Sequence, residues 1–251
     1  MAGTQLLLAD EDVEIGGKEE HIGEGGIQND FAYNNNVNNA HIKIRMAFLR
    51  KVYGLLSIQL LMTVIVSAVF MSCDSVKFFV QQNSWTVGLS FILTMGILIA
   101  LHFKRREHPI NLILLGAFTL IQSYTVGIVV SMYETAVVLE ALFITLVVVC
   151  GLTIFTFQTK RDFSFLGFGL FAGLCGLLVG GFIQLFVQST VLELFIGIAG
   201  AVLFSIFIIF DTQLLMHTLS PEEYILATIN IYLDIINLFL HILRALAASR
   251  Q

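Results

Sequence analysis

The chain of 251 residues is 57 % hydrophobic and only 12 % charged, and its formal net charge is −5. Soluble domains are closer to half apolar and a quarter charged, so this composition excludes a soluble globular domain and indicates a polytopic membrane protein. Eight of the eighteen acidic residues lie within the first thirty positions. The remainder of the chain is therefore slightly cationic, although the whole chain is acidic.

The first forty residues are acidic, rich in glycine and asparagine, and poor in apolar residues. Such a segment cannot bury enough apolar surface to compensate for the entropy lost on folding. We therefore expect residues 1–40 to form a disordered cytosolic tail, with partner binding as an alternative role. Residues 41–251 are expected to form the membrane domain.

Seven apolar runs follow, each of about 20 residues, which is the length that crosses a bilayer as a helix. The fold class is therefore an all-α membrane protein, a seven-helix transmembrane bundle. The sequence Ser-Pro-Glu-Glu at 220–223 predicts the start of the last helix, with Ser220 as its N-cap residue. The three cysteines show no disulfide or metal-binding spacing and are interpreted as small buried packing residues. The spans are expected near residues 50–72, 85–103, 110–132, 135–157, 163–187, 192–216 and 223–246.

Lysine and arginine gather in alternate connections, which predicts the orientation of the spans. The segment before the first span and the second and fourth connections hold nine basic residues, whereas the first, third and fifth connections hold only Lys77. The N-terminus is therefore expected in the cytosol. Seven crossings would place the C-terminus on the far side, but Arg244 and Arg250 favour the cytosol. The last segment is expected either to cross the membrane fully or to re-enter.

Two aspartates lie inside the last two apolar segments, Asp211 in LFSIFIIFDTQLLM and Asp234 in YILATINIYLDIINLFLHIL. Ionisable residues within membrane spans are costly, and they usually face a cavity, an ion path or a partner. Two nearby carboxylates can share a proton, and their oxygens suit cations such as Ca²⁺. In a simple hairpin, however, Asp234 lies about 9 Å deeper than Asp211, at 1.5 Å per residue. Their contact therefore requires tilted helices or an asymmetric turn.

Asp234 belongs to a polar stripe on the last span, spaced at intervals of three and four residues along one helical face. Such a stripe must face the bundle interior or water, and we interpret it as lining an ion pathway. A hydrogen-bonded packing seam is the alternative. The stripe consists of Asn230, Asp234, Asn237, His241 and Arg244.

Other charged residues have weaker assignments. Glu140 and Glu193 lie near the far-side ends of their spans, where they are candidates for the mouth of a cation pathway or are simply solvated at the interface. Lys104, Arg105 and Arg106 most simply anchor the topology at lipid headgroups. Alternatively, one of these cations reaches the aspartates from the cytosolic side.

Three stretches resemble the Bax inhibitor-1 family, also called the transmembrane Bax-inhibitor-motif or lifeguard family, and most closely its Golgi anti-apoptotic protein branch (lifeguard 4). They are HIKIRMAFLRKVYGLLSIQLLMT, FIIFDTQLLMHTLSPEEYILA and IYLDIINLFLHILR, within a similarity that covers residues 41–247. The resemblance implies a bundle with the last helix at its centre, placed in the membranes of the Golgi or the endoplasmic reticulum. It also implies leakage of Ca²⁺ from internal stores and suppression of apoptosis.

In that family an aspartyl pair senses pH, and the matching positions here are Asp211 and Asp234. A basic residue at the cytosolic end of the second helix latches the pair in the closed state. The matching position here is Lys104 or Arg105. We call this basic residue the latch.

The leading hypothesis is a pH-regulated Ca²⁺ leak channel with a di-aspartyl gate. The alternative is a non-conducting regulator that binds other membrane proteins, such as channels or apoptosis regulators. A G-protein-coupled receptor would have its N-terminus on the opposite side of the membrane. The sequence has no metal-binding motif and no G-x-S-x-G nucleophile elbow, so it does not indicate an enzyme. We expect no cofactor and no nucleic-acid partner, with Ca²⁺ as the transported ion and the lipid bilayer as the surroundings.

Overall fold

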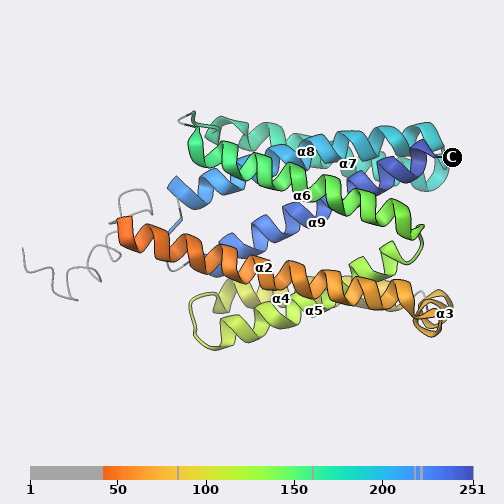
Figure 1. Cartoon of the computed structure of the whole chain (residues 1–251), viewed down its shortest axis with the longest axis horizontal. Coiled ribbons are helices and arrows are strands. Elements are labelled where there is room, and N and C mark those ends of the chain that lie inside the picture. Colours follow the sequence, from red (N-terminus) through yellow and green to blue (C-terminus); the bar gives the residue numbers. More distant parts are fainter. Residues whose placement is uncertain (1–41, 84, 160, 218, 221–222, 251) are drawn as a thin grey trace, which may run out of the picture. The chain divides into compact units, whose positions relative to one another are not determined.

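The computed structural model describes residues 42–250, apart from residues 84, 160, 218 and 221–222 (Figure 1). The tail predicted at residues 1–40 lies outside these residues. The described part of the chain is helical and contains no strand. Seven of its helices are long and apolar enough to cross a membrane, which confirms the predicted fold class. These helices are α2 (Ile42–Ser72), α4 (Trp85–Lys104), α5 (Ile110–Val130), α6 (Thr135–Gln158), α7 (Gly167–Val187), α8 (Thr190–His217) and α9 (Tyr224–Ser249).

Two short helices accompany the seven spans. The helix α3 (Asp74–Gln82) joins α2 to α4 and was not predicted, and the 3₁₀ helix η1 (Ser164–Leu166) precedes α7. Asp74 in the first turn of α3 favours this start, because a negative charge stabilises the N-terminus of a helix. The sequence did not predict α3, because the search was for apolar runs of about 20 residues and α3 has only nine.

The last helix begins later than the sequence predicts. Its N-cap residue is Glu223, whereas Ser220 was expected in that position. The Glu223 N–H donates to the Ser220 carbonyl at 2.9 Å, and α9 begins at the next residue, Tyr224. The N-cap assignment to Ser220 is therefore wrong, although the helix itself is confirmed.

The central helix is α9, which packs against α2, α5, α6 and α8. It connects one group of helices, α2, α4 and α5, with another formed by α6, α7 and α8 (Figure 1). In the apolar part of α9 67 % of the residues are buried, against 6 % in the span Ser164–Val187, which contains α7. The polar stripe of α9 favours this central position, because polar side chains within a membrane span usually face the interior of the bundle rather than lipid.

The last segment traverses the bundle from end to end. Arg244 and Arg250, near its C-terminus, form ion pairs with Glu193 of α8 and Glu140 of α6. Both acids lie near the N-terminal ends of their helices, which are at the opposite end of the bundle from Tyr224. The last segment is therefore a single helix that runs the length of the bundle and is long and apolar enough to cross a membrane. The acidic partners compensate the charges that had favoured re-entry.

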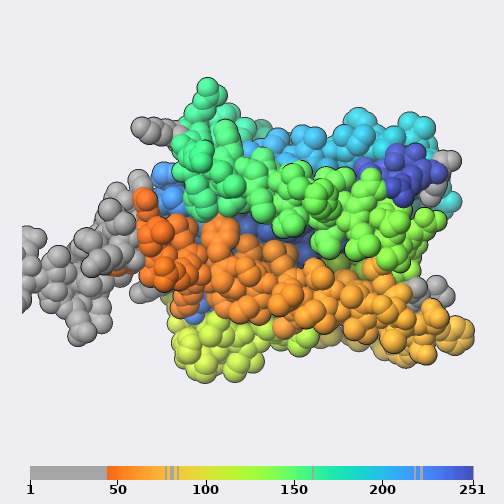
Figure 2. Space-filling model, viewed as in Figure 1, coloured from red at the N-terminus to blue at the C-terminus, as the bar shows by residue number. Residues whose placement is uncertain are grey.

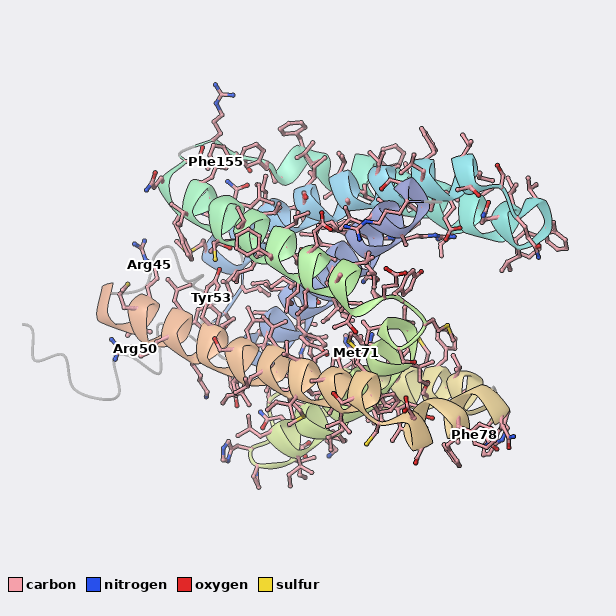
Figure 3. The ribbon with its side chains drawn as sticks, turned by 45° about the vertical axis from the view of Figure 1, so that its right-hand side comes forward. Arg45, Arg50, Tyr53, Met71, Phe78 and Phe155 are labelled. Carbon is pink, nitrogen blue, oxygen red and sulfur yellow. The ribbon has the colours of Figure 1, made fainter. Side chains whose placement is uncertain are left out.

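We name the two ends of the bundle by their residues. The basic end holds the start of α2, the α4–α5 connection and the start of α9, and the opposite end holds the start of α6 and the end of α9. Figure 3 shows Arg45 and Arg50 near the basic end of α2 and Met71 near its other end. At the basic end the amide of Asn111 donates to the Tyr224 hydroxyl at 3.0 Å. This contact ties the start of α9 to α5.

The outer faces of the helices are apolar, as expected for surfaces that contact lipid. Exposed phenylalanines are frequent, and α7 alone carries Phe168, Phe171, Phe182 and Phe186 on its surface. The three cysteines, Cys73, Cys150 and Cys175, are also exposed and unpaired. Their interpretation as buried packing residues is therefore wrong, because an apolar run in a membrane span does not reveal which of its faces meets the lipid.

Candidate functional site

The carboxyl groups of Asp211 and Asp234 meet at the contact between α8 and α9, close enough for a hydrogen bond between them. The Asp234 side chain is buried, with 6 % of the residue exposed, and Asp211 is half-buried. The Asp234 Oδ2 atom is buried without a hydrogen-bond partner. The two acids that the sequence singled out therefore form one site.

The helix geometry explains how the expected offset between the two aspartates is closed. The α8–α9 connection is centred later than a simple hairpin would place it, since α8 ends at His217 and α9 begins at Tyr224. Side chains also lean toward the N-terminus of their own helix. Asp211 thus leans away from the connection and Asp234 leans toward it, so the two carboxyl groups approach each other.

The polar stripe of α9 faces α8. His241 stacks on Phe204 of α8, with ring centroids 5.5 Å apart. Arg244 pairs with Glu193 of α8 at 3.2 Å. Asp234 meets Asp211 along the same face. Asp234, His241 and Arg244 of the stripe therefore contact α8, and Asp234 is the stripe residue that is buried.

Glycines on α8 allow this close approach. A Cβ atom at Gly200 would overlap with the His241 ring, and one at Gly197 would lie 2.9 Å from the Ala245 Cβ. Small residues at such contacts let membrane helices pack backbone against side chain. The α8–α9 seam is thus set by Gly197 and Gly200 on one helix and by the stripe on the other.

The remaining members of the stripe are held locally. The Asn237 amide donates to the Leu233 carbonyl of its own helix at 2.8 Å, and Asn230 is half-buried. Asp234 is the acid of the stripe.

Two carboxyl groups at hydrogen-bond distance can hold one proton between them, because two negative charges so close repel strongly. When both are ionised, their oxygens are the ligands that Ca²⁺ prefers. Within the described residues no group of three His, Cys, Asp or Glu side chains could hold a metal ion.

The candidate latch residues have other partners in this structure. Lys104 Nζ lies 2.7 Å from a carboxylate oxygen of Glu107, and Arg105 lies 3.2 Å from Glu223 at the start of α9. Among the ion pairs of the described residues, none joins Lys104 or Arg105 to Asp211 or Asp234. Arg105 is nevertheless bound to the helix that carries Asp234, which the sequence did not indicate.

The candidate mouth residues Glu140 and Glu193 are half-exposed and lie at the same end of the bundle. Each forms an ion pair with an arginine near the end of α9, Glu140 with Arg250 and Glu193 with Arg244. Their negative charges are therefore partly neutralised in this arrangement. Sequence spacing could not reveal these pairs, because the partners are separated by 51 and 110 positions along the chain.

Tyr133, in the connection between α5 and α6, reports on these charges. Burial raises the pKa of its phenol, Glu193 raises it further, and Arg244 lowers it. We expect Glu193→Gln to lower the Tyr133 pKa, because it removes a negative charge that opposes ionisation and leaves Arg244 in place. A pH titration of the ¹³Cζ resonance of labelled Tyr133 measures the change. Glu134→Gln, which alters the neighbouring acid instead, is the control and should leave the midpoint unchanged.

A buried polar network on α2, α5 and α9 was not predicted. Thr63 contacts Ser123 at 3.0 Å and Tyr232 at 2.8 Å, and the Gln59 amide donates to Thr119 at 2.8 Å. Gln59 and Thr63 are spaced by four residues, as are Thr119 and Ser123, which places each pair on one helical face. That spacing within apolar runs was the signal that could have revealed the network.

These features define a polytopic helical membrane protein with a pair of acids between its last two spans. The family model described as "Inhibitor of apoptosis-promoting Bax1" matches residues 45–251. "Protein lifeguard 4" of Mus musculus is 48 % identical over 225 residues, which cover 90 % of this chain and 94 % of that protein. The "Golgi anti-apoptotic protein" of vaccinia virus (strain Lister) is 47 % identical over 225 residues, covering 90 % of this chain and 95 % of its own.

A more distant relative is "Bax inhibitor 1" of Schizosaccharomyces pombe, 40 % identical over 204 residues, with 81 % of this chain and 77 % of that protein covered. The chain belongs to the Bax inhibitor family. The resemblance stated from its sequence motifs is thereby confirmed, including its likeness to the lifeguard 4 and Golgi anti-apoptotic branch.

Proposed function

We propose that this protein is a pH-regulated Ca²⁺ leak channel of internal membranes, gated at Asp211 and Asp234, which lowers store Ca²⁺ and suppresses apoptosis. The observation that carries the proposal is the contact between the two carboxyl groups at the centre of a membrane bundle. Structural packing alone does not account for a carboxyl pair in hydrocarbon, because apolar side chains would fill the same space at lower cost.

The relatives supply the cellular side of the proposal. One is named for the Golgi and for opposing apoptosis, and the family model is named for inhibiting apoptosis that Bax promotes. We extend both to this chain, with a Golgi or endoplasmic reticulum location and a cytosolic N-terminus. The positive-inside pattern of the connections supports this orientation.

In the proposed mechanism, a proton shared by the two carboxyl groups decides the state of the contact. With the proton present the groups hold α8 and α9 together, and without it they repel each other and attract cations. The latch acts from the basic end, where Arg105 binds Glu223 at the start of α9. Arg105 now pairs with Glu223, and Lys104 pairs with Glu107. If either basic residue moved from its present partner to the ionised aspartates, the movement of α9 would depend on pH.

The test is Ca²⁺ release from liposomes that contain the purified full-length protein, measured across mildly acidic to mildly alkaline pH. We expect Asp234→Asn and Asp211→Asn each to abolish the pH response and to change the leak by about tenfold, which requires a change of only about 1.4 kcal/mol in the barrier. Asparagine keeps the shape of the side chain and removes its ionisation, so packing is preserved.

Asp162→Asn is the matched control. This carboxylate is exposed in the α6–α7 connection, where the backbone N–H of Ser164 donates to it at 2.8 Å and lowers its pKa. The control should leave both the leak and its pH response unchanged. An unaltered leak and pH response in both membrane variants would refute the gate.

The same liposomes separate the alternative function. A wild-type protein that passes no Ca²⁺ at any pH would support the non-conducting regulator and would contradict the channel. Partners in other membrane proteins would then have to be sought.

A further inference from the structure

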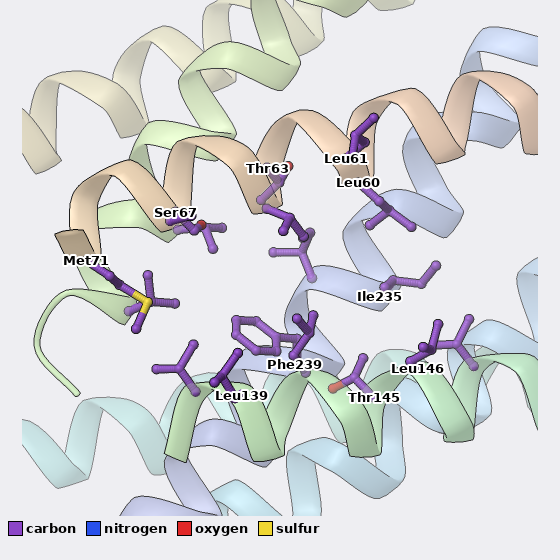
Figure 4. A pocket seen from close by; sticks show the side chains of 18 residues that line it. Leu60, Leu61, Thr63, Ser67, Met71, Leu139, Thr145, Leu146, Ile235 and Phe239 are labelled. Carbon is purple, nitrogen blue, oxygen red and sulfur yellow. The ribbon is translucent and has the colours of Figure 1, made fainter. Parts of the chain in front are cut away.

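A long groove lies between α2 and α6, away from the acid pair. Its walls are α2 and α6, its floor is formed by α5 and α9, and its volume is about 390 Å³. Figure 2 shows α9 at the bottom of a depression between these two helices, and Figure 4 shows the side chains that line it. The floor residues Ile235, Ile236 and Phe239 come from the central helix.

The groove runs along the membrane-spanning part of both walls. On α2 it extends from Leu60 to Met71, and on α6 from Val138 to Val149. Each wall therefore covers eleven residue steps, about 16.5 Å of helix at 1.5 Å per residue. Met71 is next to the last residue of α2, and Val138 is one turn inside α6. The groove thus begins near the opposite end of the bundle and reaches toward its middle.

The lining is apolar except for three hydroxyl groups. The hydroxyls of Thr63 and Thr145 already donate to backbone carbonyls of their own helices, and the Ser67 Oγ atom is buried without a partner. A water molecule needs two to four polar partners to occupy a buried site. A single unpartnered hydroxyl does not meet this need, so the groove is unsuited to water and to ions.

The shape and lining of the groove restrict its occupant. Two facing walls of about 16.5 Å with an apolar lining suit a slender apolar molecule that lies along them. Within hydrocarbon the surrounding slender molecules are acyl chains.

We propose that the α2–α6 groove binds one acyl chain of a membrane phospholipid, which lies along α2 and α6 and contacts Phe239 on its floor. The chain enters from the bilayer between exposed apolar residues on the two rims, Leu61 and Leu142. The proposal concerns binding alone and does not depend on ion conduction.

The test uses the full-length protein in liposomes that contain phosphatidylcholine with a photoreactive diazirine on one acyl chain. After illumination, mass spectrometry of peptides locates the labelled residues. We expect labels on Ile235, Ile236 and Phe239, which are only 5–7 % exposed and are out of reach of lipids that stay outside the groove. Phe182 and Phe186 on α7 are exposed and give the level of labelling by bulk lipid.

Ser67→Leu fills the groove and should remove the labels on its floor while those on α7 persist. Absence of floor labels in the wild-type protein would overturn the proposal, as would floor labels that survive in Ser67→Leu. A parallel experiment with a diazirine-bearing sterol decides between ligands, because floor labelling by the sterol and not by phosphatidylcholine would contradict an acyl-chain site.

Discussion

Replacing Gly200 with alanine should destabilise the bundle by about 1–3 kcal/mol, the usual cost of overpacking a filled interior. The added Cβ atom would overlap with the His241 ring, which is held by stacking on Phe204. On an open helix face the same change is favourable by up to about 1 kcal/mol, because alanine is the better helix former. The sign of the effect therefore separates packing from helix propensity.

Thermal unfolding of the purified protein in detergent micelles measures this loss. Gly176→Ala is the matched control, because nothing lies within 4 Å of a Cβ atom at that position of α7. His241→Ala combined with Gly200→Ala should recover most of the loss, since the obstructing ring is gone. If Gly200→Ala is as stable as the control, the seam between α8 and α9 has room for the added Cβ atom and close packing at Gly200 is refuted.

Removing the Thr63 hydroxyl with valine should destabilise the protein by about 1–3 kcal/mol, the effect of leaving a buried polar group without a partner. The protons of Ser123 and Thr63 are directed to backbone carbonyls, at 2.6 Å and 2.9 Å. The Tyr232 hydroxyl is therefore the group that donates to Thr63, and valine deprives it of this acceptor. Tyr232 is fully buried, so water cannot replace the lost bond.

Thr145→Val is the control for this change. Thr145 is equally buried on α6, but its hydroxyl bonds only to the Ala141 carbonyl of its own helix. Its removal should be close to neutral, because that carbonyl keeps its helical hydrogen bond. Equal losses in the two variants would show that the polar network adds nothing to the stability of the contact between α2, α5 and α9.

The long spans could be predicted from the sequence because each depends on local composition. A run of about 20 apolar residues has few alternatives to a membrane helix, so the seven crossings appear where expected. The common face of Asp234 and His241 was also predictable, since their spacing along the chain matches the period of a helix. The N-cap of α9 was not, because it depends on the hydrogen bond between Ser220 and Glu223.

The partners of the charged residues could not be predicted in the same way. Arg105 pairs with Glu223, and Arg250 pairs with Glu140, across distances of more than 100 positions in the chain. Such pairs arise only when helices from separate parts of the chain are placed side by side. The partner of the latch residue depends on these placements and could not be predicted. The basic charge of the α4–α5 connection is a property of the local sequence and could be.

By itself, the sequence determined that the chain is a seven-span membrane protein, that its last span carries a polar face, and that two acids lie within the membrane. These are properties of short segments, set by apolar length and helical period. Only the tertiary structure decided that Asp211 and Asp234 meet, that α9 crosses the bundle completely, and that a groove opens between α2 and α6. Each of these depends on how closely the helices pack and on their register. Glycines such as Gly200 permit the close approach, but no single segment of the chain encodes which helix will pack against it.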